Sequence, residues 1–394
     1  MPTNPDLDQA WTLIQSHCRP AGTTSLPLLE ACGRICATSL RAAMAIPHFR
    51  QSTMDGFALR RAEAQPGSKL PISGEIAAGT TSLPPWQPGQ AQRIMTGGLV
   101  PDWCDQVIPF ELCREEEGEK IVQINRLPQR SHIRGKGDDV QEGQVIIAAG
   151  EEISPGHMHL AATAGATEVT VRQRPRVAIL CTGSELVAKE PLAGQLVSGN
   201  LFLLSGLVKQ AGGKVVAAAT VADDEGALTQ ALAELPEVEM VISTGGMGPG
   251  KYDLVHQVLA TSGVEICYGQ LQLRPGKSTL FGVKDGTLFF GLPGPPPAVR
   301  LLFHELVRPA LLAQQGSLTP RPRQLTARLS EELAIRQRGI LNLKGGILSL
   351  ENGQALVRPA RRHEAASCII LVPAERLVLK EGELATIHLT DGLN

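Results

Sequence analysis

The sequence predicts a multidomain protein of the α/β plus β class, organised around a central α/β/α domain with a parallel sheet. Three glycine-rich turns between residues 175 and 316 each follow a short apolar run. Short β-like runs separated by Gly and Pro fill residues 47–138, and alternating apolar patterns return after residue 320. Because 394 residues exceed one ordinary core, two to four domains are expected.

The N-terminal part is expected to be helical from residue 7 to residue 42. Ala10–Ile14 has helical spacing, and Leu26–Gly33 is typical of a short helix that a glycine closes. Further along, Ser154 can cap a helix whose first residue is Pro155. The four predicted domains are a helical linking domain (1–46 and 139–172, with part of 27–44 packed on the α/β domain), an inserted β-rich domain (47–138), the α/β domain (173–319) and a C-terminal β domain (320–394).

The α/β domain is predicted from strands that alternate with helices. This alternation gives a parallel sheet with helices on both faces. Lys284-Asp-Gly286 between two apolar runs adds an antiparallel hairpin. After the linker Pro320–Arg323, four alternating runs predict a small β-barrel or sandwich. The expected elements of the α/β domain are strands at 177–181, 214–221, 238–242 and 264–268, and helices near 200–211, 225–235, 252–262 and 298–314.

Composition excludes several classes of function. A formal charge of −2 provides no global basic field, so no nucleic-acid partner is expected. No run of about 18 apolar residues predicts a membrane span, and the first residues lack a signal-peptide pattern. Eight cysteines without a CxxC pair indicate reduced thiols rather than disulfides or zinc. We therefore expect a soluble cytoplasmic protein.

Three loops carry the chemistry expected of the α/β domain. They are Cys181–Glu185, Ser243–Asp253 and Gly291–Pro297, and each follows a predicted strand. Loops at the carboxyl ends of parallel strands gather at one edge, where ligands bind. Glycine-rich turns that lead into helices favour anions, so an anionic small-molecule site is predicted. The alternative is that these are ordinary strand–helix turns.

Two loops of the β-rich insertion also have a chemical character. Asp55 precedes a glycine, and Thr96 lies in Met95-Thr-Gly-Gly98 after a predicted strand. Taken alone, an Asp-Gly turn is the ordinary explanation of Asp55. His157 and His159 are two residues apart on a predicted helix and make a poor metal pair.

Seven motifs occur in a fixed order along nearly the whole chain. They are Thr53–Phe57, Ile94–Gly97, Gly135–Val140, Thr182–Leu186, Thr244–Gly246 with Asp253, Arg274–Lys277 and Gly291–Gly294. Together they resemble the molybdopterin molybdenumtransferases of the MoeA family, which is related to the E domain of gephyrin and of its plant counterpart. The resemblance implies an elongated homodimer with a MogA-like α/β domain and a small C-terminal β-barrel. It also implies insertion of molybdate into adenylylated molybdopterin with release of AMP, assisted by Mg²⁺.

Matched residue by residue, the resemblance assigns site roles. The implied catalytic residues are Asp55, Glu185, Asp223, Asp253 and Lys277, of which Glu185, Asp223 and Asp253 would hold the metal. The implied substrate-binding residues are Thr96, Asp139, Thr182, Gly183, Ser184, Gly245, Gly246, Arg274, Gly276, Pro293, Gly294 and Pro296. The chemistry is compatible, because Mg²⁺ on phosphates is usually held by one or two carboxylates, and cationic side chains suit oxyanions.

The chain departs from the family pattern at several polar positions. Proline stands at 295 instead of asparagine, Ser198-Gly-Asn200 replaces Asp-Ser-Asn, and Gly248 replaces a serine. Arg361–Ser367 takes the place of a serine-rich stretch. These losses favour an alternative, a weakened paralogue that binds molybdopterin, the finished cofactor or a partner. A MogA-type adenylyltransferase is a third hypothesis. The resemblance further implies a MogA-like adenylyltransferase and molybdoenzyme chaperones as partners.

Overall fold

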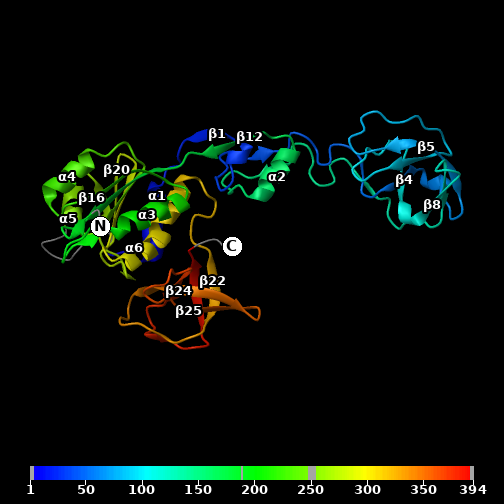
Figure 1. The fold of residues 1–394 in the computed structure, drawn as a ribbon. Coiled ribbons are helices and arrows are strands. Elements are labelled where there is room, and N and C mark those ends of the chain that lie inside the picture. Colours follow the sequence, from blue (N-terminus) through cyan, green and yellow to red (C-terminus); the bar gives the residue numbers. More distant parts are fainter. Residues whose placement is uncertain (1–3, 188–189, 247–253, 391–394) are drawn as a thin grey trace.

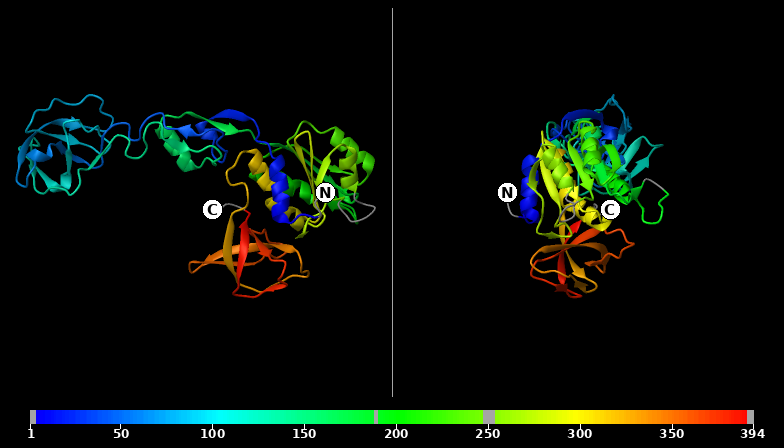
Figure 2. Two further views of the ribbon diagram at one scale, coloured as in Figure 1. Left: turned by 180° about the vertical axis from the view of Figure 1, so that it is seen from behind. Right: turned by 90° about the vertical axis from the view of Figure 1, so that its left-hand side faces the viewer.

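The computed structural model describes residues 4–187, 190–246 and 254–390 of an elongated molecule (Figure 1). An α/β domain lies at one end and a β-rich domain at the other, joined by a narrow middle region (Figures 1 and 2). A small β-barrel is attached to the α/β domain and projects sideways from the long axis. No helix in the described ranges is long and apolar enough to cross a membrane.

The α/β domain is built on a six-stranded sheet in the order β16-β13-β17-β21-β20-β18. The first four of these strands pair in parallel, and β20 is antiparallel to both its neighbours, which confirms the predicted hairpin. The strands are β13 (Arg176–Thr182), β16 (Lys214–Val221), β17 (Met240–Thr244), β18 (Glu265–Tyr268), β20 (Leu280–Lys284) and β21 (Thr287–Leu292). The helices are α3 (Gly199–Gln210), α4 (Glu225–Ala233), α5 (Leu254–Thr261) and the continuous run α6 (Pro296–Leu302), η4 (Phe303–Val307) and α7 (Arg308–Gln314).

Two cores cover the two faces of this sheet, because successive side chains on a strand point to opposite faces. On β13, Val177 and Ile179 pack against α3, α6 and α7, whereas Ala178 and Leu180 pack against α4 and α5. The glycine-rich turn Cys181–Glu185 was expected to lead into a helix, and this is wrong. There the chain forms β14 (Leu186–Val187), which pairs with β15 (Leu196–Val197) before α3 begins.

The N-terminal helix is much shorter than predicted. Only α1 (Leu7–His17) forms, and a capping box between Asp6 and Gln9 fixes its start. Its buried side chains, among them Trp11 and Ile14, join the core of the α/β domain. The predicted helix over the remainder of 7–42 is wrong, because β1 (Thr23–Pro27) pairs with a strand far along the chain.

The middle region, the predicted helical linking domain, combines one helix with two strand pairs. The pairs are β1 with β12 (Glu168–Arg172) and β2 (Leu40–Arg41) with β11 (Val145–Ile147). Helix α2 (Pro155–Thr163) starts at the predicted cap, where the Ser154 hydroxyl accepts from the His157 amide. Leu28, Ala31 and Cys36 belong to the core of this region, and the packing of part of 27–44 on the α/β domain stays a prediction.

The β-rich domain contains a sheet in the order β7-β4-β6-β5-β9-β8, with cores on both faces. Its strands are β4 (Gly56–Leu59), β5 (Lys69–Ile76), β6 (Ala91–Ile94), β7 (Gln106–Pro109), β8 (Cys113–Glu116) and β9 (Ile121–Ile124). A two-stranded pair, β3 (Gln51–Ser52) with β10 (Ile133–Arg134), lies where the chain enters and leaves this domain.

The C-terminal domain is a β-barrel and not a sandwich. Its strands pair in the order β24-β25-β22-β28-β26, and β26 pairs again with β24, so the sheet closes on itself. These strands are β22 (Gln324–Leu329), β24 (Leu341–Glu351), β25 (Gln354–Pro359), β26 (Cys368–Val372) and β28 (Leu384–Leu389). The predicted small β-barrel is therefore confirmed, whereas the predicted residue boundaries between the four domains stay predictions.

Candidate active site

The site begins where β13 and β17 end side by side. Cys181 is paired with Thr244, and the Thr182 hydroxyl donates to the Thr244 carbonyl at 3.1 Å. The turn after each strand carries predicted residues, Gly183 to Glu185 after β13 and Gly245 with Gly246 after β17. The two loops are therefore in direct contact at the carboxyl edge of the sheet.

Only glycine fits at the first position after β17. Gly245 has a φ of +86°, and a Cβ there would lie 2.1 Å from the Thr182 carbonyl oxygen. Gly246 has a φ of +62°, and a Cβ on it would lie 3.4 Å from Oδ1 of Asp223. The absence of side chains thus lets the β13 and β17 loops close on each other, with Asp223 beside them.

Two carboxylates stand at the ends of neighbouring strands. Glu185 follows β13 and Asp223 follows β16, and the two strands are paired at Thr182 and Val221. Both carboxylates are exposed, and neither is bonded to any other described residue. Glu185 folds back over its own turn, since a Cβ on Gly183 would lie 2.8 Å from both its carboxylate oxygens.

These carboxylates suit a divalent cation of the magnesium type. Mg²⁺ prefers oxygen ligands and usually takes one or two carboxylates together with phosphates and waters. Two exposed carboxylates that have no basic partner among the described residues, next to glycine turns with room for a phosphate, match that donor set. The third predicted ligand, Asp253, lies outside the described residues, and within them no group of three potential ligands gathers.

The third loop is joined to the other two by a residue that the sequence reasoning missed. Asn200, in the first turn of α3, donates its amide to the Gly294 carbonyl at 2.7 Å and to the Thr244 hydroxyl at 3.5 Å. The Oδ1 atom of Asn200 is buried without a partner among the described residues. The signal in the sequence is an amide side chain at the start of a helix that follows the strand ends.

Three prolines follow Gly294 and begin α6. Pro295 is the N-cap residue, and no side chain caps this helix. Pro293 is half-buried, whereas Gly294 and Pro296 are exposed. The change to proline at 295 therefore leaves the helix start intact but without the hydrogen bond that an asparagine side chain could supply.

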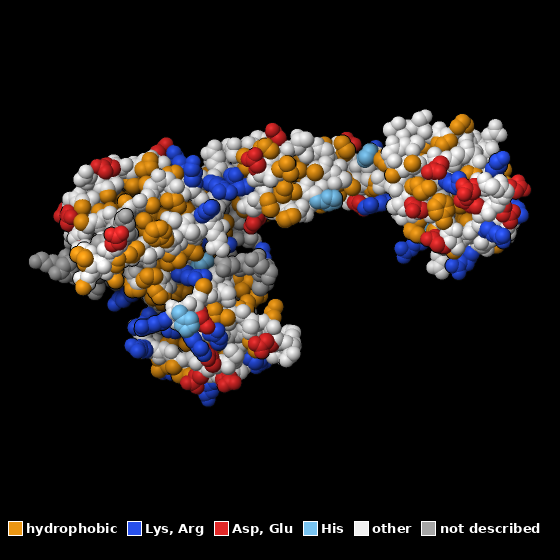
Figure 3. Space-filling model, viewed as in Figure 1, with side chains coloured by type: hydrophobic (Ala, Val, Ile, Leu, Met, Phe, Trp, Pro, Cys, Tyr) orange, Lys and Arg blue, Asp and Glu red, His pale blue; other side chains and the backbone are white. Residues whose placement is uncertain are grey.

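A cleft of about 890 Å³ separates α6 from the barrel. Arg274 and Arg300 lie on the α/β side, and four further cations, which are Arg336, Lys344, Arg361 and Arg362, line it from the barrel. The only acidic side chain in the lining, Glu364, accepts two hydrogen bonds from Arg358 and is neutralised by it. The cleft is therefore strongly cationic, and Figure 3 shows Lys and Arg side chains where the barrel approaches the α/β domain.

Arg274 and Lys277 lie on one turn but differ in their surroundings. Arg274 donates to Oε1 of Gln337 at 2.5 Å, so the barrel already engages its guanidinium. Lys277 is exposed. Between them, Gly276 has a φ of +128°, and a Cβ there would lie 2.7 Å from the Leu302 side chain. This glycine therefore lets the turn pack against α6.

Asp55 and Thr96 come together, but far from the strand ends. Oδ1 of Asp55 accepts from the Thr96 amide at 2.6 Å and from its hydroxyl at 2.8 Å. The amide and then the hydroxyl lower the pKa of the Asp55 carboxyl. Gly56 is required here, because a Cβ would lie 2.1 Å from the Ile108 carbonyl oxygen. Within one chain this pair lies at the opposite end of the molecule from the α/β domain (Figure 1).

Asp139 is also outside the main cluster. It forms an ion pair with Arg134, and its amide donates to the Ile46 carbonyl at 3.0 Å. This is the junction between the β-rich domain and the middle region. Within one chain the structure thus brings together the three α/β loops and the cleft, but neither Asp139 nor the Asp55–Thr96 pair joins them.

Comparisons with known proteins decide the family. Residues 6–165 match the MoeA N-terminal region (domain I and II), and residues 178–313 match a probable molybdopterin binding domain. A molybdopterin molybdenumtransferase of Haemophilus influenzae is 30% identical over 398 residues, which cover 97% of this chain and 98% of the relative. The chain belongs to the MoeA family of molybdopterin molybdenumtransferases.

Two more relatives agree with this assignment. A molybdopterin molybdenumtransferase of a Nostoc species is 34% identical over 300 residues, covering 73% of this chain and 69% of the relative. The crystal structure of a molybdopterin biosynthesis MoeA protein from Pyrococcus horikoshii aligns with a TM-score of 0.81 and 26% identity, covering 99% and 100% of the two chains. The predicted fold, and membership of an enzyme family of molybdenum cofactor biosynthesis, are therefore confirmed.

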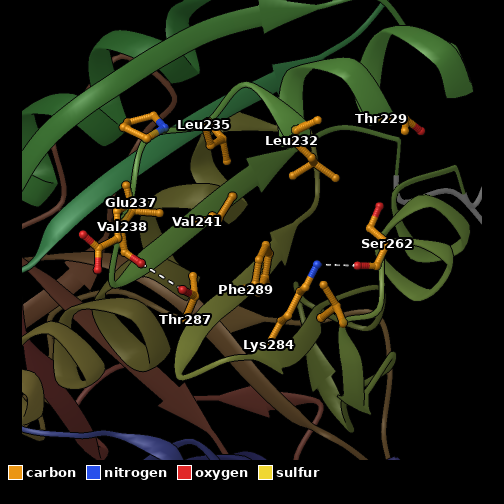
Figure 4. Close-up of a pocket in the computed structure, with 13 residues that line it drawn as sticks. Thr229, Leu232, Leu235, Glu237, Val238, Val241, Ser262, Lys284, Thr287 and Phe289 are labelled. Carbon is orange, nitrogen blue, oxygen red and sulfur yellow. Dashed lines mark hydrogen bonds between the residues drawn. The ribbon is translucent and has the colours of Figure 1, made fainter.

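A second cavity of this MoeA protein lies on the opposite edge of the sheet (Figure 4). It measures about 320 Å³ and is lined mainly by apolar side chains such as Leu232, Val241 and Phe289. The Lys284 ammonium beside it donates to the Ser262 carbonyl at 2.8 Å. This cavity contains none of the predicted site residues and lies at the amino ends of β17 and β21.

Proposed function

We propose that this MoeA protein inserts molybdenum from molybdate into adenylylated molybdopterin and releases AMP with the help of Mg²⁺. The observation that carries the proposal is the convergence, at one edge of the sheet, of three glycine-rich loops and two carboxylates that pair with no other residue of the described chain. The cationic cleft starts directly beside them, at Pro295 and Pro296. Such a surface suits a ligand with both a pyrophosphate group and a separate oxyanion.

At the pyrophosphate, the loops would bind phosphate oxygens and the carboxylates would bind the metal ion. Gly183, Gly245 and Gly246 leave room for phosphate oxygens to approach the backbone closely. Ser184 belongs to the turn after β13 and can donate its hydroxyl hydrogen, whereas the Thr182 hydroxyl donates to the Thr244 carbonyl and so holds the two turns together. Glu185 and Asp223, with Asp253, would hold Mg²⁺. When bound, this ion would neutralise charge on the phosphate oxygens and stabilise the departing AMP.

The cleft would receive the molybdate oxyanion. Arg274 offers a planar fork and Lys277 a compact ammonium, and both are preferred partners of oxyanions. Gly276 keeps the two on one tight turn. Pro296 lines the cleft on the α6 side, and Pro293 and Gly294 immediately precede it in the third loop. Because Gln337 already engages Arg274, an incoming oxyanion would replace an amide oxygen with a charged acceptor, which forms the stronger hydrogen bond.

In a homodimer, the active site of one chain would include Asp55, Thr96 and Asp139 of the other chain. Asp55 has one carboxylate oxygen that no described residue engages, and it is exposed. Since it lies far from the α/β loops of its own chain, a homodimer would be needed to bring the two together. Sedimentation tests this step, because a 41.9 kDa particle would be a monomer and would leave these residues without a role. The eight free cysteines support a reducing, cytoplasmic location.

The decisive experiment measures AMP release from adenylylated molybdopterin with Mg²⁺, with and without molybdate, followed by metal analysis of the pterin. Asp223→Asn should lower the molybdate-dependent rate by roughly 100-fold or more, as expected for a lost metal ligand. The matched control is Asp224→Asn, since Asp224 caps α4 and asparagine caps equally well. Equal rates in both variants would contradict the assigned role of Asp223.

A binding module is the second candidate, favoured by Pro295 at the N-cap of α6. Proline there removes an amide side chain from the loop that meets Gly245. In this case the wild-type protein would bind adenylylated molybdopterin in a calorimetric titration but release no AMP at any molybdate concentration. Molybdate-dependent release with metal on the pterin would exclude this candidate.

A further inference from the structure

A buried pair of side chains fastens the barrel to the α/β domain. Nδ1 of His388, on β28, lies 2.9 and 3.0 Å from the two carboxylate oxygens of Glu305, in η4. The residues are only 7% and 4% exposed. None of the chemistry proposed above uses this pair, although a buried hydrogen-bonded carboxylate is costly to maintain.

The position of Glu305 connects the pair to the site. The run α6–η4–α7 begins at the third site loop, and Arg300 on it lines the cleft and donates to the Ala366 carbonyl of the barrel at 2.7 Å. Glu305 follows five residues later, about 7.5 Å along a helix axis. It lies in a turn of π-helix, Phe303–Val307, a feature often found at functional sites.

The barrel has a second attachment across the cleft. Residues Leu273 and Arg274 pair in parallel with Leu341 and Asn342 of β24, and Arg274 also donates to Gln337. These contacts involve two-residue pairing and an exposed hydrogen bond, whereas the Glu305–His388 pair is buried. The barrel is therefore attached at several points, which also include the Arg300–Ala366 hydrogen bond and the buried Leu343 and Ile369 in the α/β core, and the pair is a buried ionisable contact among them.

Charge in the cleft acts against these attachments. Arg274 and Arg300 face Arg336, Lys344, Arg361 and Arg362 across the same space, and Glu364 is engaged by Arg358. Like charges repel, and low-dielectric walls strengthen the repulsion. Without a bound anion this repulsion favours separation of the barrel from α6, and the contacts between the barrel and the run α6–η4–α7 must oppose it.

We propose that Glu305 and His388 form a latch that holds the barrel close to α6 and thereby sets the width of the cationic cleft. Both are positioning residues, since they act through the cations of the two walls. The latch keeps the two walls of the cleft close enough, even when the cleft is empty, for cations on both walls to contact one small oxyanion when it binds. That the oxyanion is molybdate rests on the proposed function.

Hydrogen exchange and anion titration test the latch in the full chain. In His388→Leu, peptides covering 296–302 and 341–346 should exchange roughly tenfold faster, because local opening becomes easier. Molybdate should bind roughly tenfold more weakly, because the two walls no longer meet the ion together. Added KCl should reduce the excess exchange, since salt screens the repulsion. His159→Leu, an exposed histidine on α2, is the matched control.

Glu305→Gln and Glu305→Leu distinguish a latch from general stability. A glutamine can still accept from His388, so it should keep most of the exchange protection that leucine loses. Glu305→Gln also remains testable if His388→Leu fails to fold. Faster exchange confined to the surroundings of 305 and 388, with unchanged molybdate affinity, would overturn the proposal. Failure of AMP release in the wild-type protein would refute the proposed function but leave the exchange result interpretable.

Discussion

His304 should make the α/β domain lose stability at acidic pH. The residue is 2% exposed, and both of its ring nitrogens lack a hydrogen-bond partner among the described residues. Burial, with smaller contributions from Arg308 and Arg300, lowers the pKa of its imidazole from 6.5 to about 3. The folded protein therefore keeps His304 neutral at a pH where the unfolded chain binds a proton.

The sign and the size of the effect follow from proton linkage. Between pH 3 and 6.5 the unfolded state binds more protons at this position, so stability rises with pH across that window. Each pH unit in the window is worth about 1.4 kcal/mol. On going from pH 7 to pH 4, His304 alone should therefore remove about 3 kcal/mol from the free energy of unfolding.

The assay compares His304→Leu with the parent protein by urea unfolding at pH 4, 5, 6 and 7. Trp86→Phe and Trp103→Phe in both proteins leave Trp11 as the only tryptophan, and Trp11 packs in the same core as Phe303. The stability difference should shift by about 3 kcal/mol in favour of leucine as the pH falls to 4. At pH 7 leucine should be tolerated, because it removes two buried nitrogens that lack partners.

A parallel pH dependence in the two proteins would refute this reasoning. It would mean that His304 either finds a partner or gains a proton inside the fold without cost.

Two further predictions concern the loops and the barrel. Gly245→Ala should destabilise the α/β domain by about 3 kcal/mol or more, because it combines a positive φ with a backbone clash against Thr182. The control is Gly206→Ala in α3, which should be neutral or stabilising because a Cβ there meets no atom within 4 Å. The urea midpoints of the two variants measure the difference. The hydrogen bonds from Arg358, followed by that from the Arg361 amide, lower the pKa of Glu364 to about 2. The stability that this carboxylate contributes is therefore present above pH 4.5 and lost towards pH 2. Carboxyl NMR should detect the titration near pH 2 in the parent protein and at a higher pH in Arg358→Gln.

The α/β core could be predicted because its signals are local. Buried parallel strands are continuous apolar runs, and the turns between strand and helix carry glycines at positions that demand them. Gly245 is such a case. Its positive φ and its closeness to the Thr182 carbonyl both exclude a side chain, and the glycine itself is visible in the sequence directly after the apolar run. The hairpin at Lys284–Gly286 was likewise predicted from its own residues.

The missed features depend on contacts between distant segments. Thr23–Pro27 pairs with Glu168–Arg172, and this long-range pairing overrides the local helical appearance of the N-terminal region. Asn200 becomes a site residue only because α3 places its amide beside Gly294. The cleft joins Arg274 to Arg361 across domains, so no single stretch of sequence contains its signal.

The start of α6 shows why side chains must supply the positive charge in the cleft. A helix N-terminus usually attracts anions through backbone N–H groups that lack partners. Here Pro296 and Pro297 have no N–H, and the amides of Ala298 and Val299 donate to the Pro295 carbonyl. The helix therefore offers an anion almost no backbone donor, and the arginine and lysine side chains on the two walls must hold it. Because those side chains repel one another when the cleft is empty, the packing that keeps the walls together is as necessary for binding as the charges themselves.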